Sequence, residues 1–318
     1  MSETIRQPSN QYILKYILND LGYSNHQVSE VKNGDVHFIY KISTDTNQNI
    51  FVKIRRSHFR SNPNISINPT DIIYEKKAID LVNQYCPEVA PKIIKFYKHF
   101  STLCLEDVSP DHTKTVTDLI TESNPSDYKL LGNFVGHFHS SLAKCDLNIR
   151  NKLETKFYQD SLYYRLGFLN IPAISQLIDN LSLLPRQNIH GDLTPWNIVW
   201  NKDAHNFRLY DLETIHQGNT LFDISFIEAH IILETCSDPK KMLELISSFR
   251  SGYQQYLPIE DESLEVRLAL ALTYFRLNSQ SGYQIQNKIL NTTQLSKSCL
   301  NFISHPRQGR IIWKHLDI

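Results

Sequence analysis

The sequence predicts an α+β protein with a small N-terminal lobe built on an antiparallel sheet and a larger, mostly helical C-terminal lobe. Two observations lead to this prediction. The first 108 residues contain about five strand-like runs and one embedded helical pattern, whereas helical spacing of apolar residues dominates after Pro110. We therefore expect one lobe over residues 1–108 and a second over residues 109–318, with a ligand site between them.

The elements of the first lobe follow from local patterns. Helical spacing of apolar residues predicts a helix over residues 11–22 and a second one over residues 71–85. The pair Asn33-Gly34 is a strong hairpin signal between two apolar runs. Alternation over residues 49–56 predicts a third strand, and two more strand-like runs fill residues 92–108.

The second lobe begins with a long amphipathic pattern over residues 126–145, which predicts a helix. Further helices are expected over residues 223–236 and 260–281. Two short strand-like runs, around residues 196–200 and 206–210, interrupt this helical region.

Composition excludes several classes of protein. The chain has 318 residues, of which 41% are hydrophobic, as is ordinary for a globular protein. Lysine plus arginine and aspartate plus glutamate both number 33, so the formal net charge is zero and no nucleic-acid partner is expected. We find no signal-peptide core and no apolar run near the ~20 residues that span a bilayer. A soluble cytoplasmic protein without a membrane partner is expected, and no pattern indicates an oligomeric state.

Cysteines and histidines do not form a zinc pattern. The five cysteines are scattered and form no C-x-x-C pair, so we interpret them as free thiols in a reducing compartment. No H-E-x-x-H or Cys/His cluster occurs. His137 and His139 stand two positions apart on a predicted helix and therefore point in different directions, so both are expected to pack rather than to chelate.

Polar side chains interrupt two apolar runs in the middle of the second lobe. The segment HGDLTPWN supplies His190, Asp192 and Asn197, and YDLE, after the next apolar run, supplies Asp211. On loops between short strands these groups can converge, with one carboxylate to orient a nucleophile and the Asn and Asp oxygens to hold a hard cation such as Mg²⁺. This spacing follows a pattern for phosphoryl transfer, H-R-D-x-x-x-x-N followed by a metal-binding Asp.

A phosphoryl-transfer site of this type also requires a lysine on the third strand of the small lobe and a glutamate that holds it. Lys53 lies on the third predicted strand, and Glu75 lies one turn into the helix that follows. The run LCLEDV ends the fifth strand at the lobe boundary. The backbone around Glu106 and Val108 is therefore expected to bind adenine.

These motifs together resemble those of the aminoglycoside phosphotransferase and choline kinase-like family. HGDLTPWN matches the family's H-[GN]-D-x-x-x-x-N signature, and DLE matches its later acidic motif. GNTLFDIS, with Gly218 and Asp223, and VGHFHS, with His139, resemble two further stretches of the family. The resemblance covers roughly residues 25–235 and is strongest over 188–226. It implies a bilobal protein kinase-like fold, with ATP and Mg²⁺ as cofactors.

The resemblance also implies roles for the residues of the second lobe. Asp192 would accept or orient the proton of a substrate hydroxyl. Asn197 and Asp211 would bind Mg²⁺, and Glu213 would extend the metal shell directly or through water. His190, joined in this by Asp223, would brace the catalytic loop from beneath, which is a structural role.

In the first lobe, the resemblance assigns Lys53 to the α- and β-phosphates, with Glu75 holding it. The sequence departs from protein kinases here, because a G-x-G-x-x-G loop is absent and Gly22 and Gly34 are the only glycines before residue 60. The first hairpin must then cover the phosphates with Gly34 as its freely rotating position. A Walker A loop is excluded, because no Gly-Lys-Ser/Thr occurs.

The predicted function is an ATP-dependent small-molecule kinase that transfers the γ-phosphoryl group to a substrate hydroxyl. A protein kinase, a non-catalytic nucleotide-binding protein of the same fold and a metal-dependent hydrolase are the alternatives. The missing glycine-rich loop argues against a protein kinase. The filled catalytic positions argue against a non-catalytic nucleotide-binding protein, and the presence of Lys53 and Glu75 argues against a metal-dependent hydrolase.

The acceptor stays open at this point. An aminoglycoside would require a strongly acidic pocket, and choline would require an aromatic cage. A sugar or another polar metabolite is equally compatible with the sequence.

Overall fold

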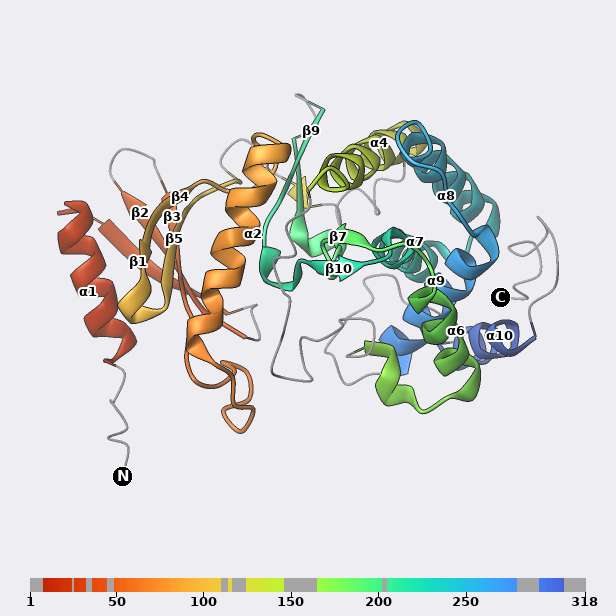
Figure 1. The fold of residues 1–318 in the computed structure, drawn as a ribbon, viewed down its shortest axis with the longest axis horizontal. Helices are drawn as coiled ribbons and strands as arrows, with labels where there is room; N and C mark the ends of the chain where they lie inside the picture. The colour runs from red at the N-terminus through yellow and green to blue at the C-terminus, as the bar shows by residue number, and fades with distance from the viewer. Residues whose placement is uncertain are drawn as a thin grey trace. The chain divides into compact units, whose positions relative to one another are not determined.

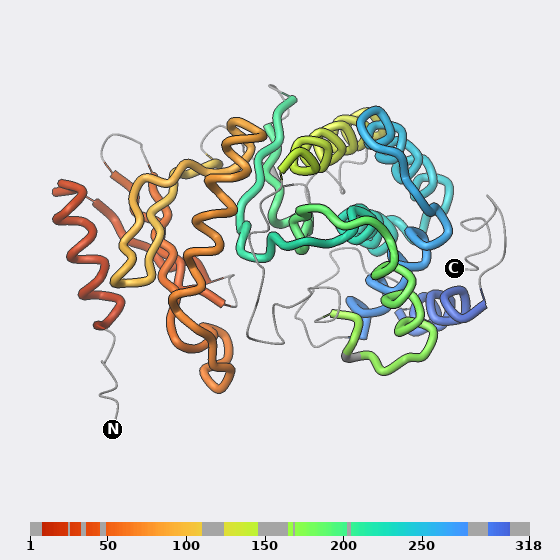
Figure 2. Tube along the Cα trace, viewed as in Figure 1, coloured from red at the N-terminus to blue at the C-terminus, as the bar shows by residue number. Residues whose placement is uncertain are grey.

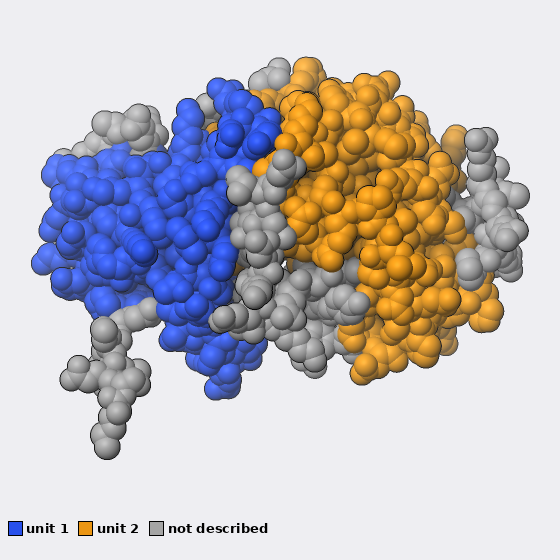
Figure 3. Space-filling view, viewed as in Figure 1, with its two compact units in different colours: residues 1–111 blue, residues 112–318 orange. Residues whose placement is uncertain are grey.

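The computed structural model describes residues 8–24, 26–32, 36–44, 49–109, 114–115, 124–145, 165–201, 205–278 and 292–305. The chain divides into two compact units, Met1–Asp111 and His112–Ile318, which Figure 3 shows in blue and orange. Each unit is described by itself below.

The N-terminal unit consists of an antiparallel sheet and two helices. Its elements, in chain order, are α1 (Asn10–Leu21), β1 (His26–Val31), β2 (Phe38–Thr44), β3 (Asn49–Ile54), α2 (Ile72–Tyr85), β4 (Ile93–Tyr97) and β5 (Thr102–Glu106). The five strands lie in the order β1-β2-β3-β5-β4, and every neighbouring pair is antiparallel. The expected turn at Asn33-Gly34 lies outside the described residues, but the two strands that flank it do pair.

Helix α1 covers one face of the sheet. Ser9 caps its N-terminus by accepting a hydrogen bond from the Tyr12 N–H, and Gly22 ends it in the left-handed conformation. One apolar face of α1 packs on the sheet in a shared core. This core contains Ile13, Leu14, Ile17, Leu18, Ile42, Ile50, Val52, Ile54, Tyr97 and Cys104. Figure 1 shows the sheet between α1 and α2.

Strand β3 lies at the centre of the sheet, between β2 and β5. Because successive side chains of a strand point to opposite faces, Val52 and Ile54 face α1 while Lys53 faces the other side, where α2 lies. The alternation that predicted the strand therefore also directs the lysine toward the second helix.

The C-terminal unit is mostly helical. Its helices are α4 (Pro125–Leu142), α6 (Pro172–Ser182), α7 (Thr220–Thr235), α8 (Pro239–Tyr253), α9 (Glu262–Asn278) and α10 (Thr292–Ser304). Its strands are β6 (Lys114–Thr115), β7 (Gln187–Ile189), β8 (Ile198–Asn201), β9 (Asn206–Leu209) and β10 (His216–Gly218). Short 3-10 turns are η3 (Gly167–Leu169), η4 (Pro195–Asn197) and η5 (Leu212–Thr214).

Helix α7 forms the centre of this unit, since every residue from Leu221 to Thr235 is buried. Because the helix is buried on all sides, its sequence has no continuous polar face. The helix starts after Asn219, whose side chain accepts a hydrogen bond from the Leu221 N–H. None of the described helices is long and apolar enough to cross a membrane. The five cysteines are free and buried.

Candidate active site

Two short antiparallel pairs form the framework of the site (Figure 2). Strand β7 pairs with β10, and β8 pairs with β9. Asn197 lies immediately before β8, and Asp211 follows the residue after β9. Since Ile198 lies opposite Leu209, and the Tyr210 N–H donates to the Asn197 carbonyl at 3.1 Å, Asn197 and Asp211 meet at the same end of this hairpin.

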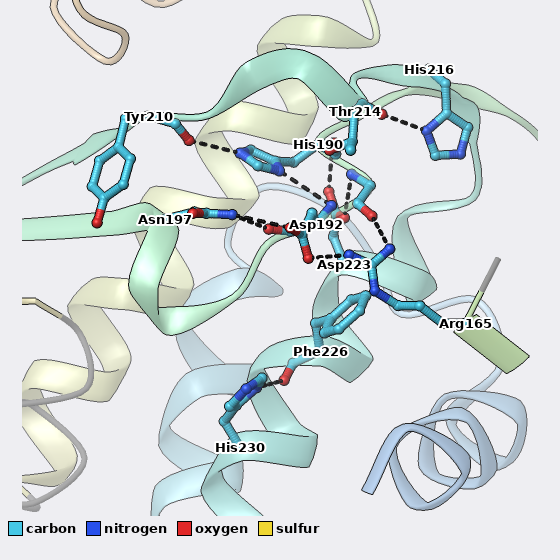
Figure 4. Close-up of polar contacts among 11 residues, drawn as sticks. Arg165, His190, Asp192, Asn197, Tyr210, Thr214, His216, Asp223, Phe226 and His230 are labelled. Atoms are coloured by element: carbon cyan, nitrogen blue, oxygen red, sulfur yellow. Dashed lines mark hydrogen bonds and ion pairs between the residues drawn. The ribbon is translucent and has the colours of Figure 1, made fainter. Parts of the chain in front are cut away.

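Asp192 lies in the loop between β7 and η4 and is held from two sides (Figure 4). The Asn197 Nδ2 donates to its backbone carbonyl at 2.9 Å and to its Oδ2 at 3.3 Å. On the other side, the Arg165 Nη2 donates to its Oδ1, and the Arg165 Nη1 donates to the Gly191 carbonyl at 3.3 Å. The Asp192 side chain keeps 22% of its surface exposed, so it is accessible to a ligand.

Asp223, in the first turn of α7, holds the start of this loop. Its carboxylate accepts hydrogen bonds from the His190 N–H at 2.7 Å and the Gly191 N–H at 2.9 Å. His139 of α4 also donates to it, from Nε2 at 3.0 Å. Burial acts to raise the pKa of Asp223, but the hydrogen bonds from His139 and the His190 backbone outweigh it, so the pKa lies below its usual value. The buried group is therefore a carboxylate.

The His190 ring connects the loop to the end of β9. Its Nδ1 accepts from the Asp192 N–H at 3.2 Å, so Nε2 carries the hydrogen and faces the Tyr210 carbonyl at 3.4 Å. The Thr214 hydroxyl donates to the His190 carbonyl at 2.8 Å. His190 thus contacts both the loop of Asp192 and the segment of Asp211, and its role in bracing the catalytic loop stays a prediction.

Gly191 meets a local steric requirement. It has a φ of 77°, in the left-handed region that favours glycine. A Cβ atom at this position would lie 2.7 Å from the His216 ring and 2.7 Å from the Thr214 carbonyl. The glycine of the HGD motif therefore allows the close approach that this loop makes to the segment after β9.

Asp211 adopts an uncommon backbone conformation. Its φ of 61° and ψ of 55° place a non-glycine residue in the left-handed region, which costs conformational energy and is often found at functional sites. Glu213 follows in η5, where its side chain is buried. Among the described residues no group of three His, Cys, Asp or Glu is arranged to hold a metal ion. A cation here would need the Asn197 amide oxygen and oxygens from a ligand.

The predicted nucleotide residues lie in the N-terminal unit. Lys53 Nζ contacts Glu75 Oε1 at 2.7 Å, and the two side chains are 6% and 2% exposed. Glu106 uses its carboxylate to accept from the Lys92 N–H at 2.9 Å, and Val108 is buried. Gly34 lies outside the described residues. Because Lys53 and Asp192 belong to different units, their meeting around one nucleotide stays a prediction.

Sequence reasoning missed two sets of contacts. No motif marks Arg165, which nevertheless contacts the candidate catalytic loop directly. His139 packs in the interior as expected, whereas His137 is exposed. His139 also bridges Asp223 and the Tyr253 hydroxyl, which lies 3.1 Å from its Nδ1. His139 and Asp223 lie far apart in the sequence and meet only because α4 and α7 pack together. Their contact can therefore be recognised only in the folded chain.

Comparison with known proteins gives structural matches. No protein-family model matches the sequence, and no curated protein matches it. Among solved structures, the amicoumacin kinase hAmiN in complex with AMP-PNP, Ca²⁺ and Ami is 17% identical, with 93% of each chain covered and a TM-score of 0.60.

Two further solved structures are similar. The choline kinase LicA from Streptococcus pneumoniae is 17% identical over 92% of this chain and 98% of that chain, with a TM-score of 0.57. A mutant aminoglycoside 2'-phosphotransferase-IIIa bound to GDP is 13% identical over 93% of this chain and 96% of that chain, with a TM-score of 0.51. At these identities the similarity shows a shared fold.

Proposed function

We propose that this chain, which has the protein kinase-like fold of those enzymes as the sequence predicted, is an ATP-dependent kinase of a small molecule. It would transfer the γ-phosphoryl group of ATP to a hydroxyl of the acceptor. The observation that carries the proposal is the position of Asp192, a partly exposed carboxylate fixed by Asn197 at the hairpin end that also carries Asp211. The five buried free thiols support a reducing compartment such as the cytoplasm.

The proposed reaction is an in-line displacement at the γ-phosphorus. The acceptor hydroxyl oxygen forms a bond to that phosphorus while the bond to the β,γ-bridging oxygen breaks. ADP leaves with the electron pair of the broken bond. Asp192 orients the hydroxyl and takes its proton, which then passes to solvent.

The groups around Asp192 support this role because they fix its carboxylate before the acceptor arrives. Asn197 and Arg165 each engage one carboxylate oxygen, and Asp223 fixes the two peptide groups just before it. Positioning of this kind contributes most of the rate in phosphoryl transfer, because little covalent chemistry is left to the protein.

The oxygen ligands available fit a hard divalent cation. Mg²⁺ needs only one or two protein carboxylates when phosphates and water complete its shell. Asp211 and the Asn197 amide would hold it, and Glu213 would extend the shell directly or through water. When bound, Mg²⁺ would neutralise charge on the transferred phosphoryl group. Lys53, oriented by Glu75, would contact the α- and β-phosphates.

Nucleotide binding and transfer can be tested separately. Calorimetry of the full chain with Mg-ATP should show binding, and a screen of hydroxyl acceptors should show acceptor-dependent release of ADP. Asp192→Asn should bind Mg-ATP with nearly unchanged affinity and lose at least ~100-fold in turnover. Asp211→Ala should weaken binding of Mg-ATP as well.

The outcomes also separate the alternatives. Wild-type turnover in Asp192→Asn would refute the assignment of this residue. Binding of Mg-ATP without transfer to any acceptor would identify a non-catalytic nucleotide-binding protein. Hydrolysis that is unchanged by Lys53→Ala would indicate a metal-dependent hydrolase instead.

A further inference from the structure

The buried carboxylate of Asp107 lies directly after β5, in the segment that is expected to bind adenine. Its Oδ1 accepts hydrogen bonds from the Ser109 N–H at 2.8 Å and from the Ser109 hydroxyl. Its Oδ2 accepts from the Asn49 Nδ2 at 3.1 Å and lies 3.3 Å from the Lys41 Nζ. Lys41 belongs to β2 and Asn49 begins β3, so one side chain ties the segment after β5 to both of these strands (Figure 1).

The Asp107 side chain is ionised although only 2% of its surface is exposed. Burial acts to raise the pKa of Asp107, but the hydrogen bonds from Ser109 and the nearby Lys41 outweigh it, so the pKa lies below its usual value. Hydrogen bonds to an ionised acceptor are stronger than those between neutral groups. We therefore expect residues 107–109 to keep one conformation whether or not a nucleotide is bound.

The main-chain N–H groups of this segment differ in whether the chain itself uses them. Those of Glu106 and Asp107 donate to carbonyls of neighbouring segments, at 3.0 Å and 3.3 Å. The N–H of Ser109 donates to the Asp107 carboxylate. Within the part of the chain that the structure describes, the N–H of Val108 has no acceptor, although this residue is 7% exposed. Buried N–H groups are nearly always paired, which makes a ligand atom the expected acceptor.

A single donor that is fixed in place can distinguish the two purine bases. Adenine presents its ring nitrogen N1 as an acceptor, whereas guanine carries a hydrogen on N1 and presents O6 as the neighbouring acceptor. Guanine would therefore have to shift so that O6 replaces N1 at the donor. A segment held by the four polar contacts of Asp107 resists such a shift, and a mismatched base leaves polar groups unpaired.

We infer that Asp107 is a positioning residue, which fixes the Val108 N–H as the donor to N1 of adenine and thereby sets a preference for ATP over GTP. The inference rests on the proposed function, whose choice of nucleotide it assigns to one side chain. Asp107 acts through the main chain of the two residues that follow it, since its own oxygens are occupied by Ser109, Asn49 and Lys41.

The first test measures binding of two nucleotides by calorimetry of the full chain. The wild type should bind Mg-ATP at least about tenfold more tightly than Mg-GTP. Asp107→Ala should raise the Kd for Mg-ATP at least about fivefold and change the Kd for Mg-GTP less than about twofold, so that the selectivity falls. Asp107→Asn should keep part of the selectivity, because its Oδ1 still accepts from the Ser109 N–H.

Asp20 of α1 provides the control in the same unit. Its carboxylate also accepts hydrogen bonds from a lysine and a hydroxyl, those of Lys95, at 2.6 Å, and Tyr97. Asp20→Ala should leave both Kd values unchanged. If Asp107→Ala lost stability while the ratio of the two Kd values stayed at the wild-type value, Asp107 would have a structural role only, and the inference would be wrong.

Adenosine and inosine give a second measurement that needs neither metal nor transfer, because the two nucleosides differ only at the edge of N1 and the group beside it. Adenosine should raise the Tm of the wild-type chain more than inosine does at the same concentration. Ser109→Ala and Lys41→Met each remove one partner of Asp107 and should reduce this difference, which provides a test even where Asp107→Ala does not fold.

The outcomes separate this inference from the proposed function. Equal Tm shifts with adenosine and inosine, or equal Kd values for Mg-ATP and Mg-GTP in the wild type, would overturn the inference while a kinase remains. Failure of both nucleotides to bind would instead refute the proposed function.

Discussion

Arg165 forms an ion pair with Asp192 and donates a second hydrogen bond to the Gly191 carbonyl, so that one side chain fixes both the carboxylate and the peptide before it. Its guanidinium in turn lies over the Phe226 ring of α7. The candidate catalytic carboxylate is thereby linked to the most buried helix of its unit. Arg165 contacts Asp192 itself, so we propose that it acts as a positioning residue.

Replacement of Arg165 should lower turnover more than nucleotide binding. Arg165→Met should reduce kcat by ~10-fold or more with an unchanged Kd for Mg-ATP, because Asp192 loses one of its two restraints. Arg165→Lys should recover part of kcat, since it keeps the charge but not the paired donors. The readout is steady-state kinetics with calorimetry. Equal kcat in Arg165→Met and in the control Arg186→Met, at an exposed arginine that donates to the Gln217 carbonyl, would show that Arg165 has no positioning role.

The buried Lys53–Glu75 pair should behave as one unit in stability measurements. Lys53→Met should lower the free energy of unfolding by about 3–5 kcal/mol, because the Glu75 carboxylate is left in the interior without its lysine. The double variant Lys53→Met/Glu75→Leu should cost less than the single one. Urea denaturation measures both values.

A surface pair provides the control for this prediction. Lys76 contacts Asp80 at 2.5 Å, with 31% and 54% of their side chains exposed. Lys76→Met should change the free energy of unfolding by no more than ~0.5 kcal/mol. If the changes in the free energy of unfolding caused by Lys53→Met and Glu75→Leu simply added in the double variant, the two residues would not be coupled.

His230 should make stability depend on pH. Burial first, and then the neighbouring Arg276, lower its folded pKa to about 3, below the ordinary histidine value near ~6.5, so between these values the unfolded chain binds a proton that the folded chain does not. Stability should therefore fall as the pH drops below ~6.5, by about 1.4 kcal/mol per pH unit from this group. Urea denaturation of wild type and His230→Leu between about pH 6.5 and pH 5 should show a smaller slope for the variant.

Gly191→Ala should destabilise the protein more than Gly22→Ala. Both glycines have positive φ, 77° and 75°, so each alanine pays about 1–2 kcal/mol for the left-handed backbone. Only at Gly191 does the new Cβ also meet a ring and a carbonyl, because nothing lies within 4 Å of it at Gly22. Thermal unfolding should therefore give the lower Tm for Gly191→Ala. Equal Tm values for the two variants would show that the loop around position 191 shifts to admit the Cβ without losing stability.

Local signals explain why much of the fold could be predicted. The helical spacing over residues 126–145 corresponds to α4, and the alternation around Lys53 corresponds to β3. Asp192 and Asn197 stand five residues apart in one loop, so their contact follows from a short segment alone. Helix α7 was expected only from residue 223, because its continuous burial leaves no periodic polar face to mark where it begins.

Contacts between distant segments could not be predicted in the same way. Arg165 meets Asp192, and His139 meets both Asp223 and Tyr253, through packing of segments that share no sequence pattern. Such contacts depend on where helices cross, which no spacing of residues encodes. The same limit applies to Trp196 of η4 and Arg276 of α9, whose guanidinium carbon lies 5.6 Å from the centre of the Trp196 ring.

Gly191 lies so close to His216 that the residue type allowed at position 191 depends on the residue at position 216. The His216 ring occupies the volume that any side chain at position 191 would enter. An asparagine at position 191, which tolerates the left-handed backbone, would therefore require both a smaller residue at position 216 and a shift of the Thr214 carbonyl, which lies 2.7 Å from the same Cβ position. In relatives that keep this loop, we expect the two positions to covary, and a paired exchange should cost less stability than the single exchange at 191.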